Sequence, residues 1–292
     1  MFPGSDAGHK IRRGTIRYFP VVPGRVEFAA EVRRLILEER PRVVAVELPE
    51  VLERLLRRAV ARLPEISVLT YPEGGGETDG GEEGAVFVTV EPADPFIEAI
   101  RSALEVGADV MFLEPETGAR PHLPDAYPDT YATQRIGFDR YVDAYRVHPQ
   151  PRSETTAAYA AGLAWKLQGA DPLASVLTVV SLNMLDPLLD AMETPQDEPA
   201  RKGFASGASL VNPHPGCLAE ILSEYPFLQE RYEKSRGQID RQKVNYELLR
   251  EAEKEYERNT GDKVVHWHRR AIAKFTRNLA RMDGELVLRL AQ

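Results

Sequence analysis

Glutamates that directly follow apolar, strand-like segments are the residues best placed to do chemistry in this sequence. Glu47 ends the run Val43-Val44-Ala45-Val46, and Glu91 and Glu114 end two similar runs. A nearly continuous apolar run is typical of a strand that is buried on both faces of a parallel sheet. Ligands of such sheets bind just beyond the carboxyl ends of the strands. The pattern therefore predicts a site at this edge without indicating its reaction.

Carboxylates gathered at one edge could act as general acids and bases or hold a hard divalent cation. Carboxylate oxygens suit Mg²⁺ and Mn²⁺, and closely spaced carboxylates raise one another's pKa. We predict Glu47 and Glu114 as the catalytic pair and as the only candidate metal ligands. Glu91 and Glu116 are further candidate binding residues. Structural alternatives exist: Glu47 could cap the helix that follows it, and Glu114 could belong to an ordinary turn.

Other reactive residue types lack the sequence context that their usual chemistry requires. Cys217 is the single cysteine and has no recognisable Cys-His motif, and Ser181 lacks a Gly-x-Ser-x-Gly turn. The run Gly74-Gly75-Gly76 lies in an acidic stretch that no helix follows, so it does not match a phosphate-binding loop. His266 and His268 would point to different faces of a helix, which makes a poor chelate.

Composition limits the classes of protein to which this chain can belong. Its 292 residues are 43% hydrophobic and 28% charged, as in ordinary globular proteins. A net charge of −8 argues against nucleic acid or an anionic membrane as the main partner. No run of about 18 apolar residues is present, which predicts no membrane span. One cysteine and a start without an apolar signal core favour a cytoplasmic location.

Alternating apolar runs and amphipathic patterns predict an α/β fold with a mostly parallel central sheet, flanking helices and a C-terminal helical extension. The expected strands are residues 11–22, 42–48, 66–71, 85–91, 109–114, 175–181 and 207–211, and the expected helices include residues 25–40, 50–62, 130–147 and 153–168. One alternative stays open, because residues 85–91 could form a hairpin with residues 66–71. Such a hairpin would put Glu91 at the edge opposite Glu47.

Long helical patterns fill the chain from about residue 217 to its end. We divide the chain into an α/β domain of residues 11–192 and a region of residues 204–292 that packs on it. The charged C-terminal helices carry apolar stripes, which predict a surface for an unknown protein partner or for homo-oligomers.

Segments spread over residues 11–192 resemble the superfamily of TraB-like, ChaN-like and erythromycin-esterase-like proteins. The first segment runs from Gly14-Thr15-Ile16-Arg17 to the strand that ends in Glu47, like the family's Gly-x-x-His strand, helix and acidic strand end. The second, residues 103–114, is similar to a family helix and strand with an acidic end, and the third is residues 175–184. The resemblance implies a hydrolase-like α/β fold with Glu47 and Glu114 at its site.

The histidines of that superfamily are missing at the matched positions. Arg17 stands where the family has the histidine of its first motif, and Asn183 is nearest to the place of a second histidine. Both are therefore candidate binding residues. Arg17 could bind an anionic group, or it could pair with Glu47 and neutralise the site.

Loss of the family histidines leaves two hypotheses about function. A zinc site held by histidines is not supported, whereas a site made of carboxylates alone for Mg²⁺ or Mn²⁺ stays open. We expect a catalytically degenerate protein that acts as a binding or scaffold domain. The alternative is a metal-dependent hydrolase of an unknown small molecule or peptide.

Overall fold

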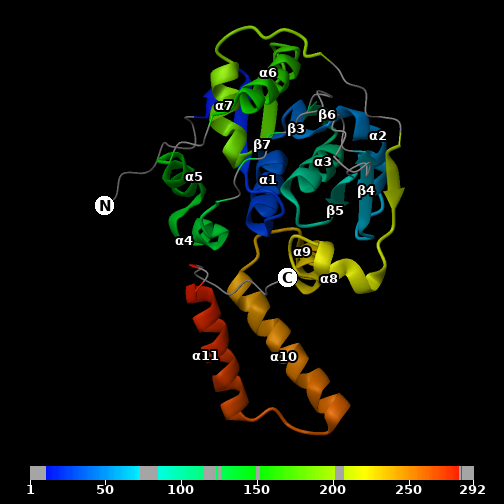
Figure 1. The fold of residues 1–292 in the computed structure, drawn as a ribbon, viewed down its shortest axis with the longest axis vertical. Coiled ribbons are helices and arrows are strands. Elements are labelled where there is room, and N and C mark those ends of the chain that lie inside the picture. Colours follow the sequence, from blue (N-terminus) through cyan, green and yellow to red (C-terminus); the bar gives the residue numbers. More distant parts are fainter. Residues whose placement is uncertain are drawn as a thin grey trace, which may run out of the picture.

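The computed structural model describes residues 11–72, 85–114, 121, 123, 126–148, 152–200, 207–282 and 284. These residues form two sheets surrounded by helices, and a long helical hairpin projects from one end (Figure 1). The predicted α/β class is confirmed. No helix among the described residues is long and apolar enough to cross a membrane.

The main sheet contains the strands that end at the predicted site. Its order is β1-β2-β7-β3-β6, in which β2, β7, β3 and β6 are parallel and β1 is an antiparallel edge strand. These strands are β1 (Arg12–Arg13), β2 (Ile16–Val21), β3 (Val43–Pro49), β6 (Asp109–Glu114) and β7 (Val176–Ser181). All six residues of β7 are buried, as expected for an interior parallel strand.

A second sheet contains the hairpin that the sequence left open. Its antiparallel order is β5-β4-β8, with β4 (Ser67–Pro72), β5 (Ala85–Val90) and β8 (Ser209–Val211). The hairpin alternative for residues 85–91 is therefore correct, although the hairpin lies outside the main sheet. β8 comes from the region beyond residue 204 and pairs with β4, so the two predicted regions share this sheet.

Helices cover both faces of the main sheet because the chain crosses it in both directions. The steps β2-α1-β3 and β3-α3-β6 advance across the sheet, whereas β6-α6-β7 returns, and right-handed crossovers place these two sets on opposite faces. The helices of this part are α1 (Val26–Glu39), α2 (Glu53–Val60), α3 (Pro95–Val106), α4 (Thr133–Ile136), α5 (Phe138–Arg146), α6 (Glu154–Gln168) and α7 (Leu185–Ala191).

Local signals explain where these helices begin and end. The Asp94 side chain accepts hydrogen bonds from the backbone N–H groups of Phe96 and Ile97, which starts α3, and Gly107 ends it in a left-handed conformation. The single helix expected over residues 130–147 is wrong, because Gly137 separates α4 from α5. Its φ of 84° and ψ of 159° lie in a region that glycine alone adopts without strain.

The C-terminal region packs on α1 and α3 before it leaves the body. It contains α8 (Leu218–Ile221), α9 (Pro226–Ser235), α10 (Arg241–Thr260) and α11 (His266–Met282). Leu228 and Tyr232 of α9 join Val26 and Ala29 of α1 in a small buried cluster. An ion pair between Arg101 and Glu233 also links α3 to α9.

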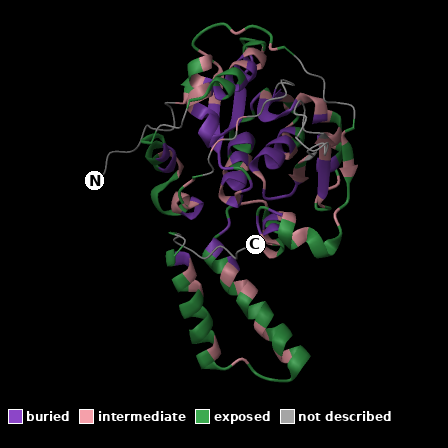
Figure 2. Cartoon of the chain, viewed as in Figure 1, coloured by how far each residue is buried: buried purple, intermediate pink, exposed green. Residues whose placement is uncertain are grey.

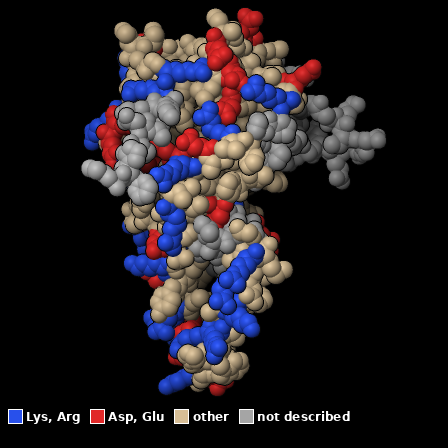
Figure 3. Space-filling view, turned by 90° about the vertical axis from the view of Figure 1, so that its left-hand side faces the viewer, with Lys and Arg blue, Asp and Glu red and all other residues tan. Residues whose placement is uncertain are grey.

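The hairpin of α10 and α11, residues 241–282, is called the arm from here on. Figure 2 shows that most of its surface is exposed and that buried residues lie near its base. In α10 only Arg241 and Val244 are buried, and in α11 only Ala280 among the described residues. The side of the arm seen in Figure 3 carries many Lys and Arg side chains.

Candidate functional site at the carboxyl edge of the main sheet

Glu47 lies at an irregularity near the end of β3. Val46 is level with Phe112 of β6, whereas Pro49 is level with Glu114, so β3 has one residue more than β6 over this interval. The pairing between β3 and β7 ends at Val46. Bulges of this kind bend a strand and change the direction of its side chains. Here the Glu47 side chain is buried, with 2% exposure.

The Glu47 carboxylate connects three elements. The backbone N–H of Ser181, at the end of β7, donates to its Oε2 at 2.6 Å. The hydroxyl of Tyr159, on α6, donates to its Oε1 at 3.3 Å. Because the ladder between β3 and β7 has already ended, the carboxylate supplies the acceptor that a strand carbonyl would otherwise provide. The next turn (Glu50–Leu52) begins without a side-chain cap, so helix capping by Glu47 is not its role.

Glu114 and Asn183 lie near the same edge. Glu114 ends β6, the neighbour of β3, and is 9% exposed. Asn183 lies in the short turn (Leu182–Met184) that follows β7, the other neighbour of β3, and is 7% exposed. The two predicted catalytic carboxylates therefore come from adjacent parallel strands. Glu116 lies outside the described residues.

Arg17 lies near the amino ends of the parallel strands, opposite the edge that holds Glu47. It is level with Leu177 of β7, which is level with Val44 near the start of β3. Its guanidinium forms an ion pair with Glu39 at the end of α1. Of the two roles left open for Arg17, pairing with Glu47 is therefore wrong, because Arg17 lies near the start of its strand and Glu47 near the end of a parallel one. Arg17 instead lines a cavity of about 490 Å³ beside α1 and α5.

Glu91 belongs to a separate buried cluster beside the second sheet. Both of its oxygens accept from the backbone N–H of Ser223 at 3.2 Å, and the Gln229 side-chain amide also donates to it. Burial raises the pKa of Glu91 to about 8, against the lowering effect of the Ser223 hydrogen bonds. Glu91 therefore lies apart from Glu47, because the strand before it belongs to the other sheet.

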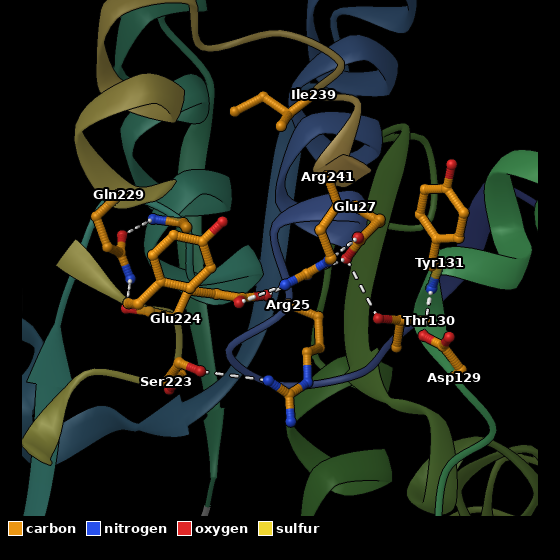
Figure 4. Close-up of polar contacts among 12 residues, drawn as sticks. Arg25, Glu27, Asp129, Thr130, Tyr131, Ser223, Glu224, Gln229, Ile239 and Arg241 are labelled. Atoms are coloured by element: carbon orange, nitrogen blue, oxygen red, sulfur yellow. Dashed lines mark hydrogen bonds and ion pairs between the residues drawn. The ribbon is translucent and has the colours of Figure 1, made fainter. Parts of the chain in front are cut away.

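A buried ion-pair cluster joins the arm to the body, and the sequence did not predict it (Figure 4). Arg241, the first residue of α10, donates to Glu27 at 2.9 and 3.0 Å and to Glu224 at 2.7 and 2.5 Å. The Thr130 hydroxyl donates to Glu27 at 3.2 Å. Burial lowers the pKa of Arg241, but its hydrogen bonds with Glu224 and the charge of Glu27 outweigh burial and raise it.

Residues distant in sequence build this cluster, so no local sequence pattern predicts it. Glu27 and Arg241 are 214 positions apart, and each looks like an ordinary charged residue in the first turn of a helix. The one available signal was the Asp240 cap, which fixes where α10 begins.

Both oxygens of the Glu47 carboxylate accept hydrogen bonds, from the Ser181 N–H and the Tyr159 hydroxyl, and these bonds would compete with a divalent cation for the carboxylate. Within the described ranges, no group of three His, Cys, Asp or Glu side chains is arranged to hold a metal ion. The arrangement holds β3, β7 and α6 together.

Comparisons with known proteins give no relative: no family model, no curated protein and no solved structure matches this chain. Function must therefore be inferred from the residues and their geometry.

Proposed function

We propose that this protein is a binding or scaffold domain and that the arm is its interaction surface. The observation that carries the proposal is an apolar groove of about 840 Å³ between α10 and α11. Its lining includes Tyr246, Leu249, Tyr256, Trp267 and Ile272. Large exposed apolar surfaces of this kind mark sites of interaction in soluble proteins.

The exposed aromatic side chains of the arm support this role. Tyr246 is 63% exposed, Trp267 66% and Phe275 64%. Tyr, Trp and Phe are enriched at protein interfaces, where they bury large areas at a small cost in side-chain entropy. A chain that left these side chains in water would lose the free energy that their burial provides.

The state of Glu47 supports the same proposal. Its carboxylate accepts hydrogen bonds from Ser181 and Tyr159 and so holds β3, β7 and α6 together. The TraB-like, ChaN-like and erythromycin-esterase-like resemblance fits a protein that kept the acidic strand end while losing the histidines. On this proposal Glu47 kept a structural role, which is to hold the three elements together.

A divalent-metal-dependent hydrolase is the second candidate function. It is favoured by one observation, that Glu47 and Glu114 end neighbouring parallel strands at the edge where such sheets bind ligands. The hydrogen bonds that Glu47 accepts from Ser181 and Tyr159 argue against the hydrolase, because they already occupy both carboxylate oxygens.

Thermal unfolding of the metal-stripped protein separates the two candidates. The scaffold proposal predicts the same melting temperature with and without Mg²⁺, Mn²⁺ or Zn²⁺. It also predicts that Glu47→Ala lowers the free energy of unfolding by about 1–3 kcal/mol with or without metal, because the Ser181 N–H loses its acceptor. Glu65→Ala, at a carboxylate 72% exposed, is the matched control and should change little.

The hydrolase candidate predicts a different pattern in the same experiment. A metal present at about 100 times its dissociation constant would add roughly 2.7 kcal/mol to the folded state. A metal-specific rise in melting temperature that Glu47→Gln abolishes would contradict the scaffold proposal.

A further inference from the structure

We propose that the partner of the arm is a second copy of this chain, and that two arms pack about a two-fold axis as a four-helix bundle. This inference rests on the proposed function, since it names what the arm binds. Two-fold homodimers are the commonest closed assemblies of soluble proteins, and antiparallel helix pairs are the usual units of four-helix bundles.

The arm lacks a core of its own. Among its described residues only Arg241, Val244 and Ala280 are buried, and two of these lie at the base of α10. Helices in water gain most of their stability from packing an apolar face. The 20 residues of α10 and 17 residues of α11 therefore need a further surface against which to pack.

The apolar residues of the arm form stripes that converge on one groove. On α10, Tyr246, Leu249 and Tyr256 follow each other at intervals of three and seven residues, which keeps them on one face. On α11, Trp267 and Ile272 line the same groove. A groove lined by two antiparallel helices accepts the ridge of another helix.

The exposed area is close to what a stable dimer requires. Tyr246, Trp267 and Phe275 are each about two-thirds exposed. Aromatic side chains bury about 150–250 Å² each, so these three would remove roughly 300–500 Å² per copy from water. Further exposed apolar side chains are Leu249, Tyr256, Ile272 and Met282. Together they bring the arm toward the ~800 Å² per partner of a standard interface.

The two helices of the arm differ in charge. α11 carries Arg269, Arg270, Lys274, Arg277 and Arg281 and no acidic residue, whereas α10 carries five glutamates beside five basic residues. With the two-fold axis along the bundle, α11 of one copy lies beside α10 of the other, so the basic side chains of α11 meet a helix without net charge and not a second α11.

An ion pair inside one arm joins its two helices. Arg269 donates to Glu253 at 2.8 and 3.0 Å. In the part of the chain that the structure describes, Arg270, Lys274, Arg277 and Arg281 form no ion pair.

A flat anionic membrane fits these features less well than a second copy does. The five glutamates of α10 offset its five basic residues, so only α11 would attract anionic head groups. The apolar residues line a concave groove, whereas interfacial helices present a convex apolar face to the membrane.

Sedimentation velocity and light scattering of the full chain over a concentration series test the proposal. We expect a species of twice the 32.7 kDa chain mass that dissociates on dilution. Trp267→Glu and Phe275→Glu should each raise the dissociation constant about tenfold or more. Both residues are largely exposed in the single chain, so circular dichroism should show an unchanged fold.

Leu173→Glu is the matched control, because Leu173 is 87% exposed and lies in a turn of the body. It should leave the dimer intact. A wild-type chain that stays monomeric, or a dimer that Trp267→Glu does not weaken, overturns the proposal. A monomer that cosediments with phosphatidylserine vesicles would likewise replace the second copy by a membrane. None of these results changes the metal titration, so the scaffold function is tested separately.

Discussion

Replacing Arg241 by methionine should destabilise the protein more than any surface substitution. Arg241 is 2% exposed, and its guanidinium makes four hydrogen bonds to the carboxylates of Glu27 and Glu224. The side chains of these glutamates are 4% and 3% exposed. Removing the cation leaves two negative charges buried side by side, so we expect a loss of about 3–5 kcal/mol in the free energy of unfolding.

Urea unfolding followed by circular dichroism at neutral pH measures this loss. Arg258→Met, at a side chain that is 72% exposed in the same helix, is the control and should cost under ~0.5 kcal/mol. A triple variant that adds Glu27→Gln and Glu224→Gln should recover part of the loss.

A loss below about 1 kcal/mol for Arg241→Met would refute this reasoning. It would mean that water reaches the two carboxylates and that the cluster does not attach the arm to the body through buried ion pairs.

Three smaller predictions concern the body of the protein. Because the pKa of Glu91 is raised to about 8, the folded state binds a proton that the unfolded state releases near 4.5, so stability should fall as pH rises between these values. Glu91→Gln should flatten that pH dependence in chemical denaturation. In thermal unfolding, Gly137→Ala should lower the free energy of unfolding by about 1–3 kcal/mol. Gly107→Ala should lower it less, because of these two glycines only Gly137 has a backbone conformation that other residues cannot adopt without strain. At both sites the added methyl group would meet no atom within 4 Å, so the difference measures backbone strain alone. Tyr159→Phe should lower the free energy of unfolding by about 1 kcal/mol. This loss is smaller than for Glu47→Ala, because the Ser181 N–H keeps its acceptor. An equal loss for the two would contradict the assigned role of Glu47.

Features with a local cause were predictable from the sequence. Asp94-Pro95 and Gly107 mark the ends of α3 because capping and left-handed termination depend on neighbouring residues. The apolar runs that end in Glu47 and Glu114 are strands of one parallel sheet, because burial on both faces requires apolar residues throughout.

Features that depend on the order of strands and on distant partners were not predictable. Arg17 and Glu47 each sit on a correctly predicted strand, yet only the register shows that they lie at opposite edges. Glu91 follows a strand run like the others, but its hairpin was free to join either sheet. The partners of Arg241 come from two other segments of the chain, so the sequence around Arg241 does not indicate them.

The pairing of β8 with β4 has a consequence for how the chain is made. The hydroxyls of Thr70 and Ser209 lie 2.7 Å apart across this pair, yet they are separated by 139 residues. During synthesis, β4 and β5 emerge first and can form their hairpin. The other edge of β4 stays unpaired until β8 has been translated. Open strand edges invite pairing with other chains. The nascent protein therefore exposes an unpaired edge of β4 until Ser209–Val211 leaves the ribosome, and a chaperone that covers this edge would protect it from aggregation.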